Sequence, residues 1–169
     1  MDKYIDLMDL VRLSQEVQGS ADITAFNRLS EDLPQQTTQT QVEWHITGHQ
    51  KPHGPALIQL QIKANPQLQC QRCMKLFHYS IATEVELEAV TSQKALDADV
   101  ADSGEIDSQA YEKILAHQPA NIIELVEDEL ILSLPYIPKH EVCQDLVELP
   151  EDNLAKKPSP FAILEKLKH

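Results

Sequence analysis

Two cysteines separated by two residues, in the sequence Cys70-Gln71-Arg72-Cys73, lie between two stretches in which apolar and polar residues alternate. Alternation with a period of two indicates strands with one buried face, so the cysteines fall at a reversal between strands. A short loop there lets two thiolates face one metal ion, as in a zinc knuckle. It differs from the thioredoxin-like C-x-x-C, which opens a helix that lowers a thiol pKa.

The third cysteine of the chain, Cys143, follows His140 by three residues. The two short motifs therefore offer four ligands of the types that zinc prefers, and we expect Cys70, Cys73, His140 and Cys143 to hold one ion. The 66 residues between Cys73 and His140 exceed ordinary zinc-finger spacing, so only the fold can bring the pairs together. The alternative is a tight turn with two thiols to which Cys143 is unrelated.

The strand pattern predicts the fold class. Alternation predicts strands at 42–47, 58–64 and 77–89, the last long enough to bend, and a short fourth strand at 111–115. The sequence therefore predicts an α+β protein in which an antiparallel β-meander, curled toward a half barrel, is packed by N-terminal and C-terminal helices.

Helices are predicted on both sides of the strands in sequence. The first covers 6–17 and ends at Gly19, and Ser20 is expected to cap a second that continues to Leu33. Asn121 is expected to cap a helix that Pro135 ends. In that helix Glu127 and Asp128 are expected to face solvent, whereas Glu129 projects from the apolar arc and needs a partner, for which Arg72 is a candidate.

The chain is expected to comprise one domain over 1–150, with a mobile acidic loop near 92–110, followed by a tail over 151–169. The tail contains a short basic helix after Pro158 and Pro160. Because such a helix is too short to be stable alone, it must dock on this protein or on a partner, anchored by Phe161 and Leu164 and assisted by Lys166.

The charge of the chain, −13 overall, is concentrated in its middle. From 84 to 152 there are 18 acids and three lysines, whereas the remainder carries 9 acids and 11 bases. An acidic surface repels a nucleic-acid backbone and suits a basic protein, although solubility alone would also explain it. Three cysteines exclude a fully paired disulfide framework, and with no signal-like or membrane-length apolar segment the expected location is the cytoplasm.

Three blocks of sequence resemble one family. They are Leu68-Gln69-Cys70-Gln71-Arg72-Cys73 followed by Phe77; Val126-Glu127-Asp128-Glu129-Leu130-Ile131-Leu132-Ser133-Leu134-Pro135 with Pro138 and His140; and Lys157-Pro158-Ser159-Pro160-Phe161-Ala162-Ile163-Leu164. In this order they resemble the YceD family, the large ribosomal RNA subunit accumulation proteins. The resemblance implies a non-enzymatic bacterial factor needed for normal levels of large-subunit ribosomal RNA. Some branches carry a second C-x-x-C where this chain has His140 and Cys143.

The function expected from the resemblance is ribosome biogenesis, through contact with large-subunit precursor RNA, a basic ribosomal protein, or both, and without membrane or DNA. Lys63, Arg72 and Lys75 are the candidate RNA-binding residues, with Lys51 nearby, unless Arg72 pairs with the acidic helix. Candidate partner-binding residues are Glu127, Asp128, Glu129, Phe161, Leu164 and Lys166. Two alternatives are a chaperone for one basic ribosomal protein without RNA contact, and a small thiol- or zinc-dependent enzyme.

Overall fold

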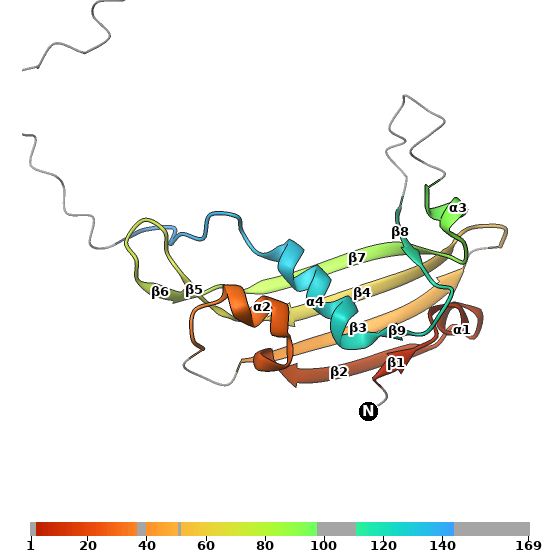
Figure 1. Cartoon of the computed structure of the whole chain (residues 1–169), viewed down its shortest axis with the longest axis horizontal. Coiled ribbons are helices and arrows are strands. Elements are labelled where there is room, and N and C mark those ends of the chain that lie inside the picture. The colour runs from red at the N-terminus through yellow and green to blue at the C-terminus, as the bar shows by residue number, and fades with distance from the viewer. Residues whose placement is uncertain (1–2, 37–39, 51, 98–110, 144–169) are drawn as a thin grey trace, which may run out of the picture.

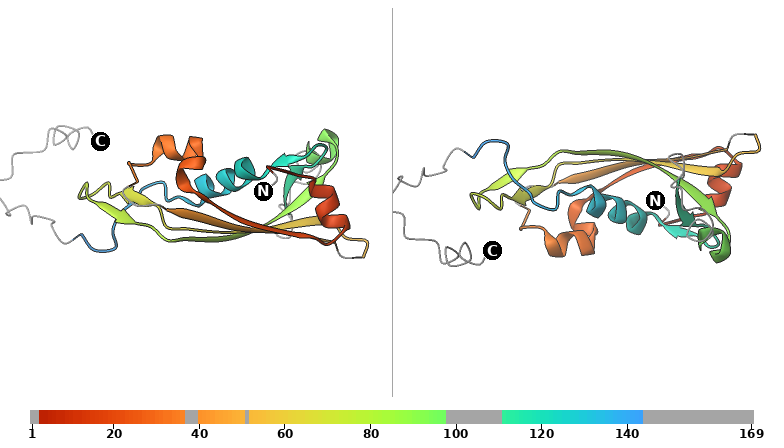
Figure 2. Two further views of the ribbon diagram at one scale, coloured as in Figure 1. Left: turned by 90° about the horizontal axis from the view of Figure 1, so that it is seen from below. Right: turned by 90° about the horizontal axis from the view of Figure 1, so that it is seen from above.

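A curved sheet with helices on one face forms the body of the protein (Figures 1 and 2). The computed structural model describes residues 3–36, 40–50, 52–97 and 111–143. The elements are β1 (Tyr4–Ile5), α1 (Leu7–Arg12), β2 (Glu16–Asp22), a 3₁₀ turn (Ile23–Ala25), α2 (Asn27–Asp32), β3 (Gln41–Gln50), β4 (Ala56–Ala64), β5 (Gln67–Gln69), β6 (Leu76–His78), β7 (Ile81–Val90), α3 (Gln93–Leu96), β8 (Glu112–Leu115), β9 (Ala120–Asn121) and α4 (Ile122–Ser133).

The main sheet has five strands in the order β2-β3-β4-β7-β8. β2, β3, β4 and β7 are antiparallel neighbours, which confirms the predicted meander, and the sheet stays open. β8 differs from the prediction because it joins the edge of the sheet parallel to β7. The intervening segment includes α3 and supplies the crossover that a parallel pair requires.

The core lies between the sheet and the helices. Ile46 and Ile62 project from β3 and β4 into one cluster with Val126 and Leu130 of α4. Trp44 packs edge-on against Phe26, with ring centroids 6.4 Å apart. Helices cover only one face of the sheet, so successive residues of β3 and β4 point alternately toward the helices and toward solvent. Burial along these two strands therefore alternates with a period of two residues.

The predicted N-terminal helices are wrong in extent. α1 ends at Arg12, and the chain turns through Ser14, whose φ is 48°, into β2. Gly19 therefore ends no helix, and Ser20 caps none, because both lie within β2. The prediction missed that β2 alternates too, with Gln18 and Ser20 more exposed than their neighbours.

α1 packs tightly on β3 at Gly48. A Cβ atom built on Gly48 would lie 2.5 Å from the backbone of Leu10, closer than real contacts allow. The backbone N–H of Gly48 also donates to the carbonyl of Gln15 at 3.1 Å. A residue without a side chain is therefore required where this helix crosses the strand.

α4 begins after Asn121, as predicted, and Asn121 caps it by accepting a hydrogen bond from the N–H of Ile123. Asp128 is exposed, as predicted, but the predicted orientation of Glu127 is wrong. Glu127 is buried at 4% exposure, and Glu129 is only partly buried. Glu127 faces α2, where Arg28 binds it at 2.9 Å. Arg72, the partner suggested for Glu129, instead donates to Cys143 and His140. The prediction for Glu127 failed because helical periodicity locates a single apolar arc, whereas α4 also faces α2.

The predicted long strand over 77–89 is interrupted, so that β6 and β7 are separate strands. β5 and β6 pair as a small hairpin that holds the C-x-x-C loop at the opposite end of the molecule from α1 and α3 (Figure 1). Within the predicted loop near 92–110, α3 is a short helix capped by Ser92. The rest of that loop, 98–110, and the tail lie outside the described residues. Within the described part of the chain, no helix is long and apolar enough to cross a membrane.

Candidate metal centre

The four predicted ligands meet at the β5–β6 hairpin. The ligand atoms of Cys70, Cys73, His140 and Cys143 all lie within 4.8 Å of one another. The Sγ atoms of Cys70 and Cys143 are 3.7 Å apart. His140 Nδ1 lies 3.3 Å from the Sγ of Cys73 and 3.8 Å from that of Cys143. The fold therefore brings together two motifs that are far apart in sequence.

These separations fit a tetrahedral zinc ion. Zn–S bonds of about 2.3 Å place two sulfurs about 3.8 Å apart, and a Zn–N bond of about 2.0 Å places sulfur and nitrogen about 3.5 Å apart. The sulfur–sulfur distance between Cys70 and Cys143, 3.7 Å, agrees with the first of these separations. The distances from His140 Nδ1 to the sulfurs of Cys73 and Cys143, 3.3 and 3.8 Å, are close to the second. Three thiolates and one imidazole are also the soft donor set that favours zinc over magnesium or calcium.

Backbone hydrogen bonds fix the hairpin loop that carries the first two ligands. The N–H of Cys70 donates to the carbonyl of Lys75 at 2.9 Å, and the N–H of Met74 donates to the carbonyl of Cys70 at 2.8 Å. Met74 adopts a positive φ of 61°, which turns the chain back into β6. The loop geometry is therefore set by the backbone itself.

A second set of contacts holds the His140 loop against the hairpin. The N–H of Gln71 donates to the carbonyl of Pro138 at 2.9 Å. The rings of Phe77 and His140 pack with centroids 4.7 Å apart. Pro135 and Pro138 prevent α4 from continuing, so the chain runs extended to the hairpin (Figure 1). These contacts therefore hold the His140 loop against the hairpin.

Arg72 lies beside the candidate ligands. Its Nε donates to the Sγ of Cys143 at 3.0 Å, and its Nη2 donates to the carbonyl of His140 at 3.3 Å. Three thiolates around a divalent cation leave a net single negative charge, and a guanidinium donating to one sulfur offsets it. Arg72 therefore supports the centre from outside the ligand set.

The thiol pKa values indicate a site prepared for a cation. Burial raises the pKa of Cys70, but hydrogen bonds from the backbone of Cys73, His140 and Arg72 and from the His140 side chain outweigh it and lower the pKa to about 5. For Cys73, the N–H of Lys75 lowers the pKa, yet burial and the neighbouring sulfurs prevail and raise it. Crowded sulfurs resist joint ionisation, which a divalent cation would relieve.

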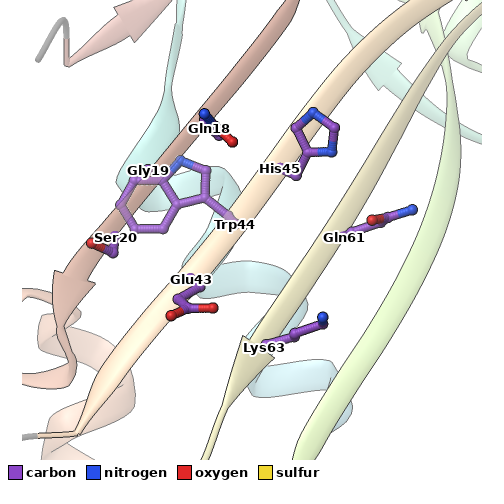
Figure 3. Close-up of a pocket in the computed structure, with 8 residues that line it drawn as sticks. All are labelled: Gln18, Gly19, Ser20, Glu43, Trp44, His45, Gln61 and Lys63. Carbon is purple, nitrogen blue, oxygen red and sulfur yellow. The ribbon is translucent and has the colours of Figure 1, made fainter.

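The predicted RNA-binding residues do not form one group in the structure. Lys75 lies exposed in the hairpin loop, next to the centre. Lys63 instead lies on the helix-free face of the sheet, opposite Glu43 in register, and lines a hollow over β2, β3 and β4 with Gln61 and His45 (Figure 3). Lys51 lies outside the described residues.

Trp44 also borders this hollow, although its side chain belongs to the core on the helical face of the sheet, and it carries one unusual polar group. The indole of Trp44 extends from β3 toward Gly19, its register partner on β2, and is buried at 4% exposure (Figure 3). Its Nε1 has no hydrogen-bond partner among the described residues. Because Gly19 has no side chain, it leaves room for the indole beside it on the helical face of the sheet.

Exposed residues near the centre were missed by the sequence reasoning. Tyr136 is 96% exposed, and Met74, Leu76, Ile137 and Val142 are also exposed large apolar side chains. Over 70–78 and 136–143 the chain carries three bases, Arg72, Lys75 and Lys139, against one acid, Glu141. Of these bases, only Lys139 was missed, because it lies within the strongly acidic range 84–152.

Of the predicted partner-binding residues, Glu127 is engaged inside the protein. Asp128 is exposed and bonds Arg28 at 2.7 Å, and Glu129 is partly buried at the surface of α4. The other three, Phe161, Leu164 and Lys166, lie outside the described residues.

Comparison with known proteins identifies a family and a curated relative. The family described as "Large ribosomal RNA subunit accumulation protein YceD" matches residues 58–168. A curated protein of the same description from Haemophilus influenzae is 32% identical over 153 residues, which cover 85% of this chain and 82% of that protein. No solved structure matches the chain.

Proposed function

Because the chain belongs to the YceD family of large ribosomal RNA subunit accumulation proteins, we propose that it supports accumulation of that RNA in the bacterial cytoplasm by binding a large-subunit precursor with its hairpin end. The observation that carries the proposal is the convergence of Cys70, Cys73, His140 and Cys143, which joins two loops into one surface. Zinc at this centre would lock the surface.

The surface has the chemistry that RNA binding requires. Lys75 and Lys139 supply positive charge for phosphates beside a centre in an otherwise acidic protein. Tyr136 is almost fully exposed, and an exposed aromatic ring offers a platform on which an unpaired base can stack. Arg72 contributes through the centre, because its guanidinium is already bonded to Cys143 and His140.

The role of the metal in this proposal is structural. A Cys₃His set supplies four protein ligands, and a closed shell leaves no position for a reacting water or substrate. The ion would supply rigidity and charge neutralisation, while the exposed side chains around it make the contact. This arrangement favours a binding protein over a thiol- or zinc-dependent enzyme.

The test is association with ribosomal precursors in cell lysates separated on density gradients. Lys75→Glu with Lys139→Glu should remove the protein from large-subunit precursor fractions, and Tyr136→Ala should weaken association without changing metal content. The matched control is Lys94→Glu on α3, at the opposite end of the molecule. If the double variant co-sediments as the wild type does, the hairpin end is not the contact. Arg72→Glu is a poorer probe because it also disturbs the centre.

A second candidate function is a chaperone for one basic ribosomal protein. The supporting observation is the row Glu84, Glu86 and Glu88, which faces outward along β7 on the helix-free side of the sheet. In this reading a basic segment lies on that face without RNA contact. Crosslinking in cells separates the two, because adducts to large-subunit RNA from the hairpin support the first and adducts to a ribosomal protein from β7 support the second.

A further inference from the structure

A groove on the helical side of the protein combines an apolar floor with an acidic rim. It runs between α4 and the β7–β8 edge, and Leu87, Ile114, Leu125 and Leu132 line its floor. Leu132 is 70% exposed although it is a large apolar residue, and its neighbour Ile131 is partly exposed as well. An apolar floor left open in this way is typical of a surface that another segment covers.

The rim of the groove carries three carboxylates, Glu112, Asp128 and Glu129, against two cations, Arg28 and Lys113. Lys113 donates from Nζ to the backbone carbonyl of Ala95 at 3.1 Å. Asp128 is paired with Arg28, but none of the ion pairs among the described residues involves Glu112 or Glu129. Desolvation raises the pKa of Glu129, and the nearby carboxylates of Glu112 and Asp128 raise it further. A cationic group placed here would therefore be favoured.

We propose that the groove is the docking site of this chain's own basic C-terminal segment, 156–168. That segment contains four lysines and one glutamate, opposite in sign to the rim. On a helix over 161–167, Phe161, Ile163, Leu164 and Leu167 would cover an arc of about 160°. Lys166 would lie about 60° beyond one edge of this arc and Glu165 about 40° beyond the other. Apolar face and positive charge thus match the floor and the rim of the groove.

The covalent connection makes this occupant favourable. Ser133, at the end of α4, is ten residues before Cys143, so these two residues are at most about 35 Å apart. The 18 residues from Cys143 to Phe161 can span about 60 Å, so the tail reaches the groove with slack. A tether of this length gives an effective concentration on the order of millimolar, which suits a short helix that binds weakly alone.

The charge of the neighbouring segment argues against it as the occupant. Residues 98–110, which lead from α3 toward β8, contain four acids and no base. Their charge has the same sign as that of Glu112 and Glu129. The acids of α4 and the tail were predicted separately as partner-binding residues. In this proposal they bind each other within one chain.

The test uses the full-length protein, labelled with ¹⁵N and ¹³C and studied by NMR. Backbone dynamics of 161–167 should resemble those of the helices in the body. Leu132→Ser should release the tail, because it removes an exposed floor residue without opening the core. Leu13→Ser is the matched control, since Leu13 is also exposed but lies after α1. Phe161→Ala with Leu164→Ala should shift the methyl signals of Leu125 and Leu132 and leave those of Ile58 unchanged.

Charge exchange gives an independent readout. Glu129→Lys should free the tail, and adding Lys166→Glu and Lys168→Glu to that variant should restore ordered dynamics at 161–167. The docked state should also be independent of protein concentration, because the contact is within one chain. The proposal is overturned if 161–167 moves freely in the wild type, if tail substitutions leave the groove signals unchanged, or if docking appears only as the concentration rises, which would indicate a second copy.

Discussion

Glu127 should be far more important to stability than its neighbour Asp128, although both bind the same arginine. The Glu127 carboxylate accepts from Arg28 Nε at 2.9 Å and from the backbone N–H of Leu29 at 3.2 Å. The side chain of Glu127 is 5% exposed, whereas that of Asp128 is 57% exposed. The second bond matters because no side chain at the start of α2 caps that helix, so Glu127 supplies the acceptor from α4.

The magnitude follows from these contacts. Glu127→Ala removes two hydrogen bonds to a buried carboxylate and leaves the Leu29 N–H without its acceptor, while half-exposed Arg28 recovers water, so the loss is about 3 kcal/mol. Asp128→Asn removes a solvent-exposed pair worth about 0.5 kcal/mol. With about 3 °C per kcal/mol for a chain of this size, the thermal midpoint should fall by about 9 °C and about 1–2 °C.

Differential scanning calorimetry of the two variants, at equal metal content, measures this contrast. Glu127→Gln is a useful third variant, because its amide oxygen can still accept from Leu29 and it should fall between the other two. Equal shifts for Glu127→Ala and Asp128→Asn would refute the reasoning, since they would mean that burial of the carboxylate does not decide its contribution.

Three further outcomes are expected. Purified protein should contain about one zinc per chain, and removing the zinc with a chelator, or Cys143→Ser, should lower the thermal midpoint; absence of zinc from protein made with ample supply would contradict this. In metal-free protein, the absorbance of one thiolate should persist on acidification to about pH 5, and it should be absent from Cys70→Ser. The pKa of Cys70 is lowered from 9.0 to about 5, so its ionisation stabilises the fold at high pH, and this contribution is lost as the pH falls through 5. Gly48→Ala should destabilise by about 2–3 kcal/mol in urea denaturation because its Cβ would meet the backbone of Leu10, and a neutral effect would show that α1 moves freely on β3.

The sheet could be predicted from sequence where one physical signal dominated. β3 and β4 each have one face against the core, so alternation predicted both strands and which of their residues face the core. Both strands are longer than predicted, and β3 continues beyond 47 to Gln50. β2 was missed because Gly19 and Ala21 interrupt the apolar pattern, although Gly19 is small for a reason: it lies opposite Trp44. The parallel placement of β8 depends on a long crossover, for which local sequence carries no signal.

The metal ligands could be named because cysteine is rare in this chain and the two motifs have the right donor types. Their approach could not be derived, since it depends on how α4 crosses the sheet and where Pro138 directs the chain. The inward side of α4 was misjudged for a related reason. Helical periodicity locates one apolar arc, but a helix that touches both a sheet and a second helix has two inward sides, and Glu127 occupies the second.

Cys70 and Cys143 are 73 residues apart in the sequence, so the four ligands can meet only after the chain has been synthesised and folded beyond α4. A chain that has been made only as far as β7 contains two of the four ligands and cannot enclose an ion. Closing a loop of this length costs about 4 kcal/mol of chain entropy. Folding of the sheet and α4 already offsets this cost before the ligands come together. Tight retention of zinc would therefore distinguish a finished, folded copy from a truncated or unfolded one, without any additional recognition element.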